Sequence, residues 1–302
     1  MHLLKVDIHG GDYPTTRYYP FNIPVLRRTP GLTFRRPVAF FVGENGSGKS
    51  TLLEAITRKC GIHIWDKPKR HVAHDNPFET RLRDYITVTW ANGGVPGSLF
   101  RAETFRDLAD FLDDVALCDP GRLKYHGGRI LNTLSHGEGI LSYFGGRYHI
   151  KGLYILDEPE AALSPASQLK FLKLLHILEQ DGHAQFVIAT HSPILLAHPG
   201  AQIFSFDASR VEEVAYEDTA HYRLYRQFFS DRSAVLEAQG IVEHAEGSDA
   251  TPRPRDRAPE ASERAAVCVE RDGSSPVVKR SHGLDASRML AVRGTGAITE
   301  PT

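Results

Sequence analysis

Residues 38–56 of the chain read VAFFVGENGSGKSTLLEAI, and this stretch decides the fold. The run VAFFV (38–42) is short, apolar and rich in aromatic and β-branched residues, as expected of a strand buried on both faces. The stretch TLLEAIT (51–57) has a helical pattern. Between them lies GENGSGKST, which fits a phosphate-binding loop in its strand-to-helix context. The sequence therefore predicts an α/β fold with a polyphosphate site where this strand ends.

The nine residues of this loop are all expected to contribute to nucleotide binding: Gly43, Glu44, Asn45, Gly46, Ser47, Gly48, Lys49, Ser50 and Thr51. The glycines let the backbone wrap a polyphosphate, so that its amides and the N-terminus of the following helix face the negative charge. Lys49 should reach the β and γ phosphates, and Ser50 should supply a hydroxyl to Mg²⁺. A chance match in a chain of this length is of order one in a hundred from average residue usage.

A second apolar strand, LYIL (153–156), ends in two adjacent carboxylates, Asp157 and Glu158. Successive side chains at a strand end point in different directions, so one can bind Mg²⁺ while the other faces the γ phosphate. We expect Asp157 to be the metal ligand and Glu158 to orient or deprotonate the attacking water. Taken alone, such a pair is more often a solvated turn, and the phosphate loop upstream favours the catalytic interpretation.

A third strand, QFVIA (185–189), is closed by Thr190, His191, Ser192 and Pro193. His191 at this position could hydrogen-bond the γ phosphate and hold the water in line. Leucines on a helical period within 165–180, preceded by Ser164 and followed by Gly182, predict a crossover helix. Ligands of open α/β sheets gather at the carboxyl ends of the strands, so the three polar segments should meet there.

The segment LSHGEG (134–139) lies upstream of the acidic strand. Ser135 with Glu138 three residues later is a capping box that begins a helix. Gly137 and Gly139 are poor choices in a first helical turn unless something approaches the backbone closely. This helix start is therefore a candidate second phosphate site.

GENGSGKST, LSHGEG, LDEPEAALS and ATHSP, in this order, resemble the phosphate loop, signature, acidic strand and switch histidine of ATP-binding-cassette (ABC) ATPases. The resemblance covers roughly residues 1–235. It implies a core with an antiparallel β subdomain and a helical signature lobe. It also implies ATP and Mg²⁺ as cofactors, and a homodimer in which Ser135, Gly137 and Glu138 cover the γ phosphate held by the partner's loop. Ser164 stands where the family usually has Asp.

Finer features look like the soluble branch that includes RecF-type ATPases, specifically small stand-alone predicted ATPases. YYPFNIPVLRR (18–28), FRAETF (100–105) and THSPILLA (190–197) carry this likeness. Glu103 is a candidate for the metal-contacting Gln of transporter subunits. Two alternatives stay open, namely an ATP-binding subunit of an ABC transporter and a low-turnover nucleotide switch associated with DNA. The effector, a protein or a nucleic acid, stays unknown.

Two features of the N-terminal region leave functional and structural interpretations open. Tyr18, Tyr19 and Phe21 could stack on adenine or pack the small β subdomain. The basic residues Arg27, Arg28, Arg35 and Arg36 could meet a DNA backbone or form a solvated surface.

The chain has 302 residues, 41% of them hydrophobic, which is enough for one large or two ordinary domains. The 36 basic and 37 acidic side chains leave no charge excess that would draw it to nucleic acid or an acidic membrane. No apolar run approaches the roughly 20 residues of a membrane span, and no secretory signal is visible, so we expect a cytoplasmic protein without membrane insertion. The three cysteines are expected to be reduced thiols.

The composition changes near residue 235. From Ser230 to Thr302 there is no Phe, Trp or Tyr, and the stretch is rich in Pro, Arg, Ser, Ala and Glu. Such a segment buries little apolar surface. We therefore predict an ATPase domain over 1–235 and a disordered tail over 236–302.

Overall fold

The computed structural model describes residues 1–65 and 76–241. Its largest sheet has six strands in the order β5-β6-β7-β3-β8-β9, all parallel to their neighbours except that β8 and β9 pair antiparallel. The strands are β3 (Val38–Val42), β5 (Gly97–Arg101), β6 (Gly152–Asp157), β7 (Ala184–Ala189), β8 (Gln202–Ser205) and β9 (Glu212–Val214). The strands predicted from apolar runs, β3, β6 and β7, are adjacent in this sheet, so the predicted α/β core is confirmed.

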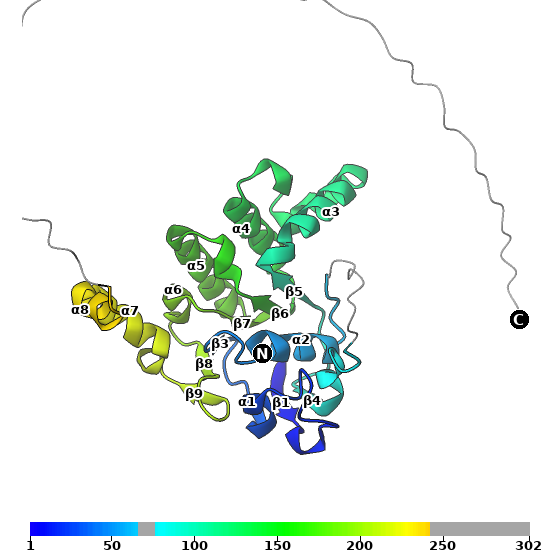
Figure 1. Cartoon of the computed structure of the whole chain (residues 1–302). Helices are drawn as coiled ribbons and strands as arrows, with labels where there is room; N and C mark the ends of the chain where they lie inside the picture. The colour runs from blue at the N-terminus through cyan, green and yellow to red at the C-terminus, as the bar shows by residue number, and fades with distance from the viewer. Residues whose placement is uncertain (66–75, 242–302) are drawn as a thin grey trace, which may run out of the picture. The chain divides into compact units, whose positions relative to one another are not determined.

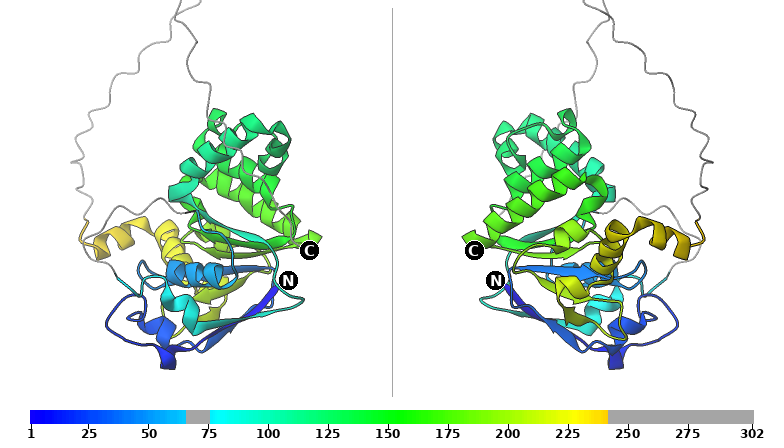
Figure 2. Two further views of the ribbon diagram at one scale, coloured as in Figure 1. Left: turned by 90° about the vertical axis from the view of Figure 1, so that its right-hand side faces the viewer. Right: turned by 90° about the vertical axis from the view of Figure 1, so that its left-hand side faces the viewer.

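A smaller antiparallel sheet has the order β2-β1-β4 and forms the predicted β subdomain. Its strands are β1 (Leu3–Ile8), β2 (Gly31–Thr33) and β4 (Ile86–Trp90). Helix α2 (Lys49–Lys59) contacts β4 as well as β6 and β7. Its buried Leu52 and Ile56 share one apolar cluster with Val6 of β1 and Phe41 of β3. The helix after the phosphate loop is therefore held between the two sheets (Figures 1 and 2).

A second apolar cluster covers the other face of the large sheet. It joins Phe40 of β3 and Phe186 of β7 to Phe144 of α4 (His136–Arg147) and Phe171 of α5 (Pro165–Asp181). Phe40 and Phe41 belong to different clusters because successive strand residues face opposite sides of the sheet. Burial on both faces explains why the central strands read as unbroken apolar runs.

Helices α3 (Phe105–Cys118) and α4 form the predicted helical lobe (Figure 1). The buried carboxylate of Asp113 on α3 accepts the backbone N–H groups of Leu131 at 2.9 Å and Asn132 at 2.8 Å. These bonds tie α3 to the segment that leads into α4. The start of α4 is therefore fixed to the rest of the lobe.

The predicted crossover helix is α5, which begins and ends where the sequence places its caps. Ser164 accepts the N–H of Ser167 at 3.2 Å, Pro165 is the first helical residue, and Gly182 closes the helix at φ 70°. A left-handed residue at this end favours glycine. Ser164, at the position where the family usually has Asp, serves here as a helix cap.

The remaining helices are short: α1 (Pro24–Arg28), α6 (Pro193–Leu196), α7 (Ala220–Ser230) and α8 (Arg232–Ala238). Helix α8 continues past the domain boundary predicted at residue 235. Residues 242–302 lie outside the described residues, so the predicted disorder of this tail stays a prediction. Within residues 1–65 and 76–241, no helix combines the length and the apolar character needed to cross a bilayer.

Candidate functional site

The three polar segments predicted to meet do follow adjacent strand ends. Asp157 at the end of β6 pairs in register with Ala189 at the end of β7. Ala189 in turn pairs in register with Phe41 near the end of β3. The phosphate loop leaves β3, Glu158 follows Asp157, and His191 lies two residues beyond Ala189. The parallel register thus brings the loop, the carboxylates and the histidine to one edge of the sheet.

The phosphate loop is shaped as a cradle around the Lys49 side chain. The ammonium of Lys49 donates to the carbonyl oxygens of Gly43 at 2.6 Å and Glu44 at 3.0 Å. Burial lowers the Lys49 pKa, and the nearby carboxylates, Glu158 first among them, oppose this shift. The same ammonium group can donate its hydrogen bonds to the negatively charged oxygens of a polyphosphate.

Gly48 caps α2 in a conformation that favours glycine. Its φ is 103°, and a Cβ atom there would lie 3.0 Å from Cγ2 of Ile23. No side chain caps the N-terminus of α2. The hydroxyl of Ser47 beside it is buried without a hydrogen-bond partner among the described residues. Uncapped amides at a helix start bind anions, so the cradle fits a phosphate group.

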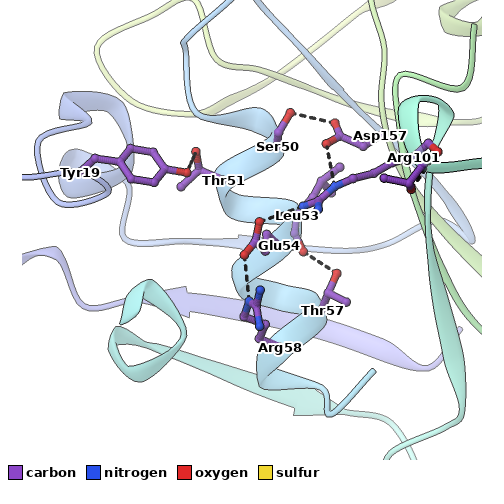
Figure 3. A network of polar contacts seen from close by, with 10 residues as sticks. Tyr19, Ser50, Thr51, Leu53, Glu54, Thr57, Arg58, Arg101 and Asp157 are labelled. Atoms are coloured by element: carbon purple, nitrogen blue, oxygen red, sulfur yellow. Dashed lines mark hydrogen bonds and ion pairs between the residues drawn. The ribbon is translucent and has the colours of Figure 1, made fainter. Parts of the chain in front are cut away.

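A cavity of about 460 Å³ opens beside the loop and is lined by Tyr19, Asn45, Lys49, Thr51 and Glu158, among others. This volume is in the usual range for small-ligand sites. The hydroxyls of Tyr19 and Thr51 are 3.2 Å apart, and Figure 3 shows the Tyr19 ring reaching toward α2.

The three aromatic residues predicted as adenine-stacking candidates therefore have different positions. Phe21 is only 1% exposed and packs against Tyr13 and Tyr85 in the subdomain, which fits the structural interpretation. Tyr18 is exposed, and it is absent from the lining of this cavity. Only Tyr19 of the three lines it, and it becomes the candidate for contact with the base or ribose.

A neighbouring cavity of about 330 Å³ is lined by Ser50, Glu103, His136, Asp157 and Glu158, among others. The Ser50 hydroxyl donates to Asp157 Oδ1 at 2.8 Å. Burial raises the Asp157 pKa, and the Ser50 hydrogen bond opposes the shift. A hydroxyl and a carboxylate side by side are the hard oxygen ligands that Mg²⁺ prefers, so these residues fit a magnesium ion. Glu103, the candidate for the transporter Gln, lies at this cavity.

Arg101 is a residue of this site that the sequence interpretation missed. It ends β5 in register with Asp157, and its Nε lies 3.8 Å from Asp157 Oδ2. Its Nη2 donates to Glu54 of α2 at 2.8 Å, and Glu54 also accepts from Arg58 (Figure 3). Burial alone would raise the Glu54 pKa, but the bonds from Arg58 and Arg101 lower it overall. This network fixes Asp157 relative to the helix that carries Ser50.

Glu158 has a backbone conformation that is unusual for its type. Its φ and ψ are 49° and 53°, and it is the one non-glycine residue with positive φ in the described ranges. Such a conformation costs about 1–3 kcal/mol and is found mainly at functional sites. The side chain is 46% exposed, and its Oε1 lies 3.5 Å from Nε2 of His191.

His191 is held by two residues that the sequence interpretation also missed. Its backbone N–H donates to Glu160 Oε1 at 2.6 Å, and its Nδ1 lies 3.1 Å from Nε2 of His221 on α7. Burial lowers the pKa of both histidines, and for His191 the positive charge of Lys49 adds to this effect. Both rings are therefore neutral near pH 7. Burial raises the Glu160 pKa, opposed by the hydrogen bond from His191.

Asp207, just after β8, is a further missed residue. Its Oδ1 accepts the backbone N–H of Glu44 at 2.8 Å and so holds the phosphate loop from the side of β8. Its charge also acts on Lys49 and His221.

Two protein-family profiles match the chain over the segments that carry these motifs. One, described as "AAA domain", matches residues 22–80, and the other, described as "AAA domain, putative AbiEii toxin, Type IV TA system", matches residues 121–197. The first includes the phosphate loop, and the second includes the signature, the acidic strand and His191. These matches support an ABC-class P-loop ATPase domain in this chain.

Known relatives of this ATPase domain include transporter proteins. An energy-coupling factor transporter ATP-binding protein of Methanospirillum hungatei is 27% identical in an alignment 250 residues long that covers 73% of this chain and 56% of the relative. A methionine import ATP-binding protein of Pseudomonas fluorescens is 25% identical in an alignment 260 residues long that covers 78% of this chain and 74% of the relative. The chain thus spans about half the length of the first of these relatives.

Among solved structures, the ADP conformation of an ATP-binding cassette of an ABC transporter has a TM-score of 0.45 at 15% identity, covering 80% of this chain and 99% of that chain. The SMC head domain from Thermotoga maritima has a TM-score of 0.41 at 16% identity, covering 71% of this chain and 99% of that chain. The matches named here do not single out the RecF-like branch, which stays a prediction.

The signature segment of the ATPase domain begins α4 as predicted. The backbone N–H and the hydroxyl of Ser135 donate to Glu138 Oε2 at 3.1 and 2.5 Å. These two bonds, the hydroxyl first, lower the Glu138 pKa. A Cβ atom at Gly137 would lie 3.3 Å from the carbonyl oxygen of Ala162, so the chain's own backbone accounts for this glycine.

The structure does not bring Ser135, Gly137 and Glu138 to the phosphate loop of the same chain. None of the three lines the cavity beside Lys49 or the cavity beside Asp157. Of the signature segment, only His136 lies at the second cavity. Ser135 and Glu138 are exposed and accessible to another molecule.

Proposed function

We propose that the chain binds ATP with Mg²⁺, dimerises on binding it and hydrolyses it. The single observation that carries this proposal is the convergence of Lys49, the Ser50–Asp157 pair and Glu158 on two adjoining cavities. Each group has the chemistry that one part of a nucleoside triphosphate requires.

Each residue has a proposed part in the reaction. Lys49 and the loop amides hold the β and γ phosphates. Ser50 and Asp157 would hold Mg²⁺, which when bound neutralises charge on these phosphates. Glu158 accepts a proton from the attacking water while the oxygen of this water forms a bond to the γ phosphorus. The bond from this phosphorus to the bridging oxygen breaks, and ADP leaves with the electron pair.

We assign His191 and His221 to one unit in this step. A neutral imidazole has one donor nitrogen and one acceptor nitrogen. If His221 Nε2–H donates to His191 Nδ1, the proton of His191 is on Nε2, the nitrogen on the Glu158 side. That nitrogen can then donate to the γ phosphate. His221 is in this proposal a positioning residue, because it acts through His191.

The signature residues support a site shared between two copies. Ser135 and Glu138 are exposed and do not line their own chain's cavities. We propose that Ser135, Gly137 and Glu138 cover the γ phosphate held by a second copy, as the ABC family implies.

The test uses Glu158→Gln, which removes the base but keeps the side-chain length. Light scattering with saturating Mg-ATP should show a dimer for this variant and single chains without nucleotide. Lys49→Ala in the same background is the matched control and should stay monomeric. Normal ATP turnover by Glu158→Gln would refute the role of Glu158, and single chains throughout would refute the shared site.

Two alternatives differ in what the ATPase serves. The names of the relatives support a role as an ATP-binding subunit of a membrane transporter, with the domain on the cytoplasmic side. Co-purification of a membrane protein would support it. The alternative of a DNA-associated switch has weaker support, because Arg35 of the basic cluster is paired with Glu213 at 2.7 Å. Turnover measured with and without duplex DNA separates the two.

A further inference from the structure

A cluster of potential metal ligands lies on α5 and the segment that follows α6. His176 and Glu179 are three residues apart on α5 and share one helix face. His198 comes from the segment between α6 and β8, and α5 and α6 lie side by side (Figure 1). One ligand atom from each of the three residues lies within 4.8 Å of the others.

His198 is the unusual member of this cluster. Its side chain is 0% exposed, and neither ring nitrogen makes a hydrogen bond of good geometry with the described residues, although backbone groups of His198 and Pro199 lie close to the ring. The nearest charged group is Glu179, whose Oε2 is 3.8 Å from His198 Nε2. A buried polar group without a partner costs about 1–3 kcal/mol, so it calls for an explanation.

The distances also fit a transition metal. Nitrogen and oxygen ligands at about 2.0–2.1 Å around tetrahedral zinc are about 3.3 Å from one another. The 3.8 Å between His198 and Glu179 needs only a small adjustment. The exposed His176 can close the remaining gap by side-chain rotation.

We propose that His176, Glu179 and His198 bind one divalent transition-metal ion, with zinc as the first candidate. Two imidazoles and one carboxylate form a borderline-soft ligand set that suits zinc better than magnesium. The ion joins the end of α5 to the segment that leads from α6 into β8. None of the three residues lines the cavities at the phosphate loop, so the site is separate from the nucleotide site.

A second group, His149, Asp181 and His183, is a weaker candidate and provides the control. His149 and Asp181 are exposed, and His183 Nε2 already contacts the carbonyl oxygen of Tyr148 at 3.1 Å. A variant here removes an exposed histidine of the same kind without touching His198.

The experiment titrates the full chain, stripped with a chelator, with Co²⁺ and follows its visible absorption. Zn²⁺ affinity is then measured by competition with a chromophoric chelator. We expect one ion per chain with the intense bands of four-coordinate cobalt. His176→Ala and Glu179→Gln should each weaken Zn²⁺ binding more than tenfold, and His149→Ala should leave it unchanged.

Thermal melting supplies a readout independent of absorption and of ATP turnover. Zn²⁺ should raise the Tm of the parent chain but not that of His176→Ala. Because His176 is exposed, its replacement by Ala should leave the fold intact. Absence of Zn²⁺ binding to the parent chain would overturn the proposal. So would equal affinity in His176→Ala, or loss of binding in His149→Ala.

Discussion

Replacing His221 by Phe isolates the proposed partnership between the two histidines. The change keeps a ring of similar shape and removes the nitrogen that lies 3.1 Å from His191 Nδ1. Without this donor, His191 is free to place its proton on Nδ1, which leaves Nε2 unable to donate to the γ phosphate. We therefore expect a lower kcat with little change in KM, because Lys49 and the loop amides hold the nucleotide.

The size of the effect follows from one hydrogen bond. A hydrogen bond between neutral, partly buried groups contributes about 0.5–1.5 kcal/mol net. At 1.36 kcal/mol per factor of ten, kcat should fall about 2- to 13-fold. A much larger loss would indicate damage beyond this bond.

The matched variants are His221→Gln and His221→Asn, assayed by steady-state phosphate release. The Gln amide nitrogen can take the place of Nε2, whereas the shorter Asn cannot reach it. Gln should restore most of the activity and Asn should not. In a His191→Ala background, His221→Phe should have no further effect, because coupled residues are not additive. Equal losses of kcat in His221→Phe and His221→Gln would refute the reasoning. So would a loss of kcat from His221→Phe that is just as large in the His191→Ala background.

Three further predictions concern binding, pH and the core. Lys49→Ala should weaken ATP binding at least tenfold in calorimetry, since it removes a charge from the β and γ phosphates. Burial raises the Glu160 pKa, so ionising this side chain is less favourable in the folded protein than in the unfolded chain. The free energy of unfolding of the parent chain therefore falls as pH rises from the ordinary Glu range toward the raised pKa. The Tm advantage of Glu160→Gln over the parent chain should therefore grow from pH 4 to pH 8, and a constant difference would contradict it. Phe186→Ala should cost about 3–5 kcal/mol in urea unfolding, because Phe186 is fully buried against Tyr148 and Tyr154.

The central strands and the crossover helix could be predicted because their signals are local. VAFFV matches β3 residue for residue, since burial on both faces leaves no polar position in it. The two ends of α5 could be predicted from Ser164 and Gly182, because a hydroxyl cap and a left-handed residue act within one helical turn. Strand β5 (Gly97–Arg101) gave no such signal, since it begins with Gly and Ser and is defined by its pairing with β6.

The candidate site divides in the same way. The phosphate loop is one continuous segment and Asp157 and Glu158 are adjacent, so residue types and spacing were enough to predict these parts of the site. Arg101, Asp207 and His221 act through contacts with residues 30 to 163 positions away. Their types are ordinary for surface residues, and only the register of the sheet and the position of α7 bring them to the site.

The exposure of Glu158 gives a physical reason why the proposed dimer would be needed for turnover. A carboxylate that is 46% exposed is well solvated, and its interactions with a developing charge are weak in water. Covering the cavity would exclude water, leave only the water that reacts, and strengthen the contacts of Lys49 and His191 with the γ phosphate. Ser135 and Glu138 are already ordered by their own hydrogen bonds, so a partner could present them with little further loss of conformational freedom. Dimerisation would then be a condition of hydrolysis, and turnover per chain should rise with protein concentration until the dimer is saturated.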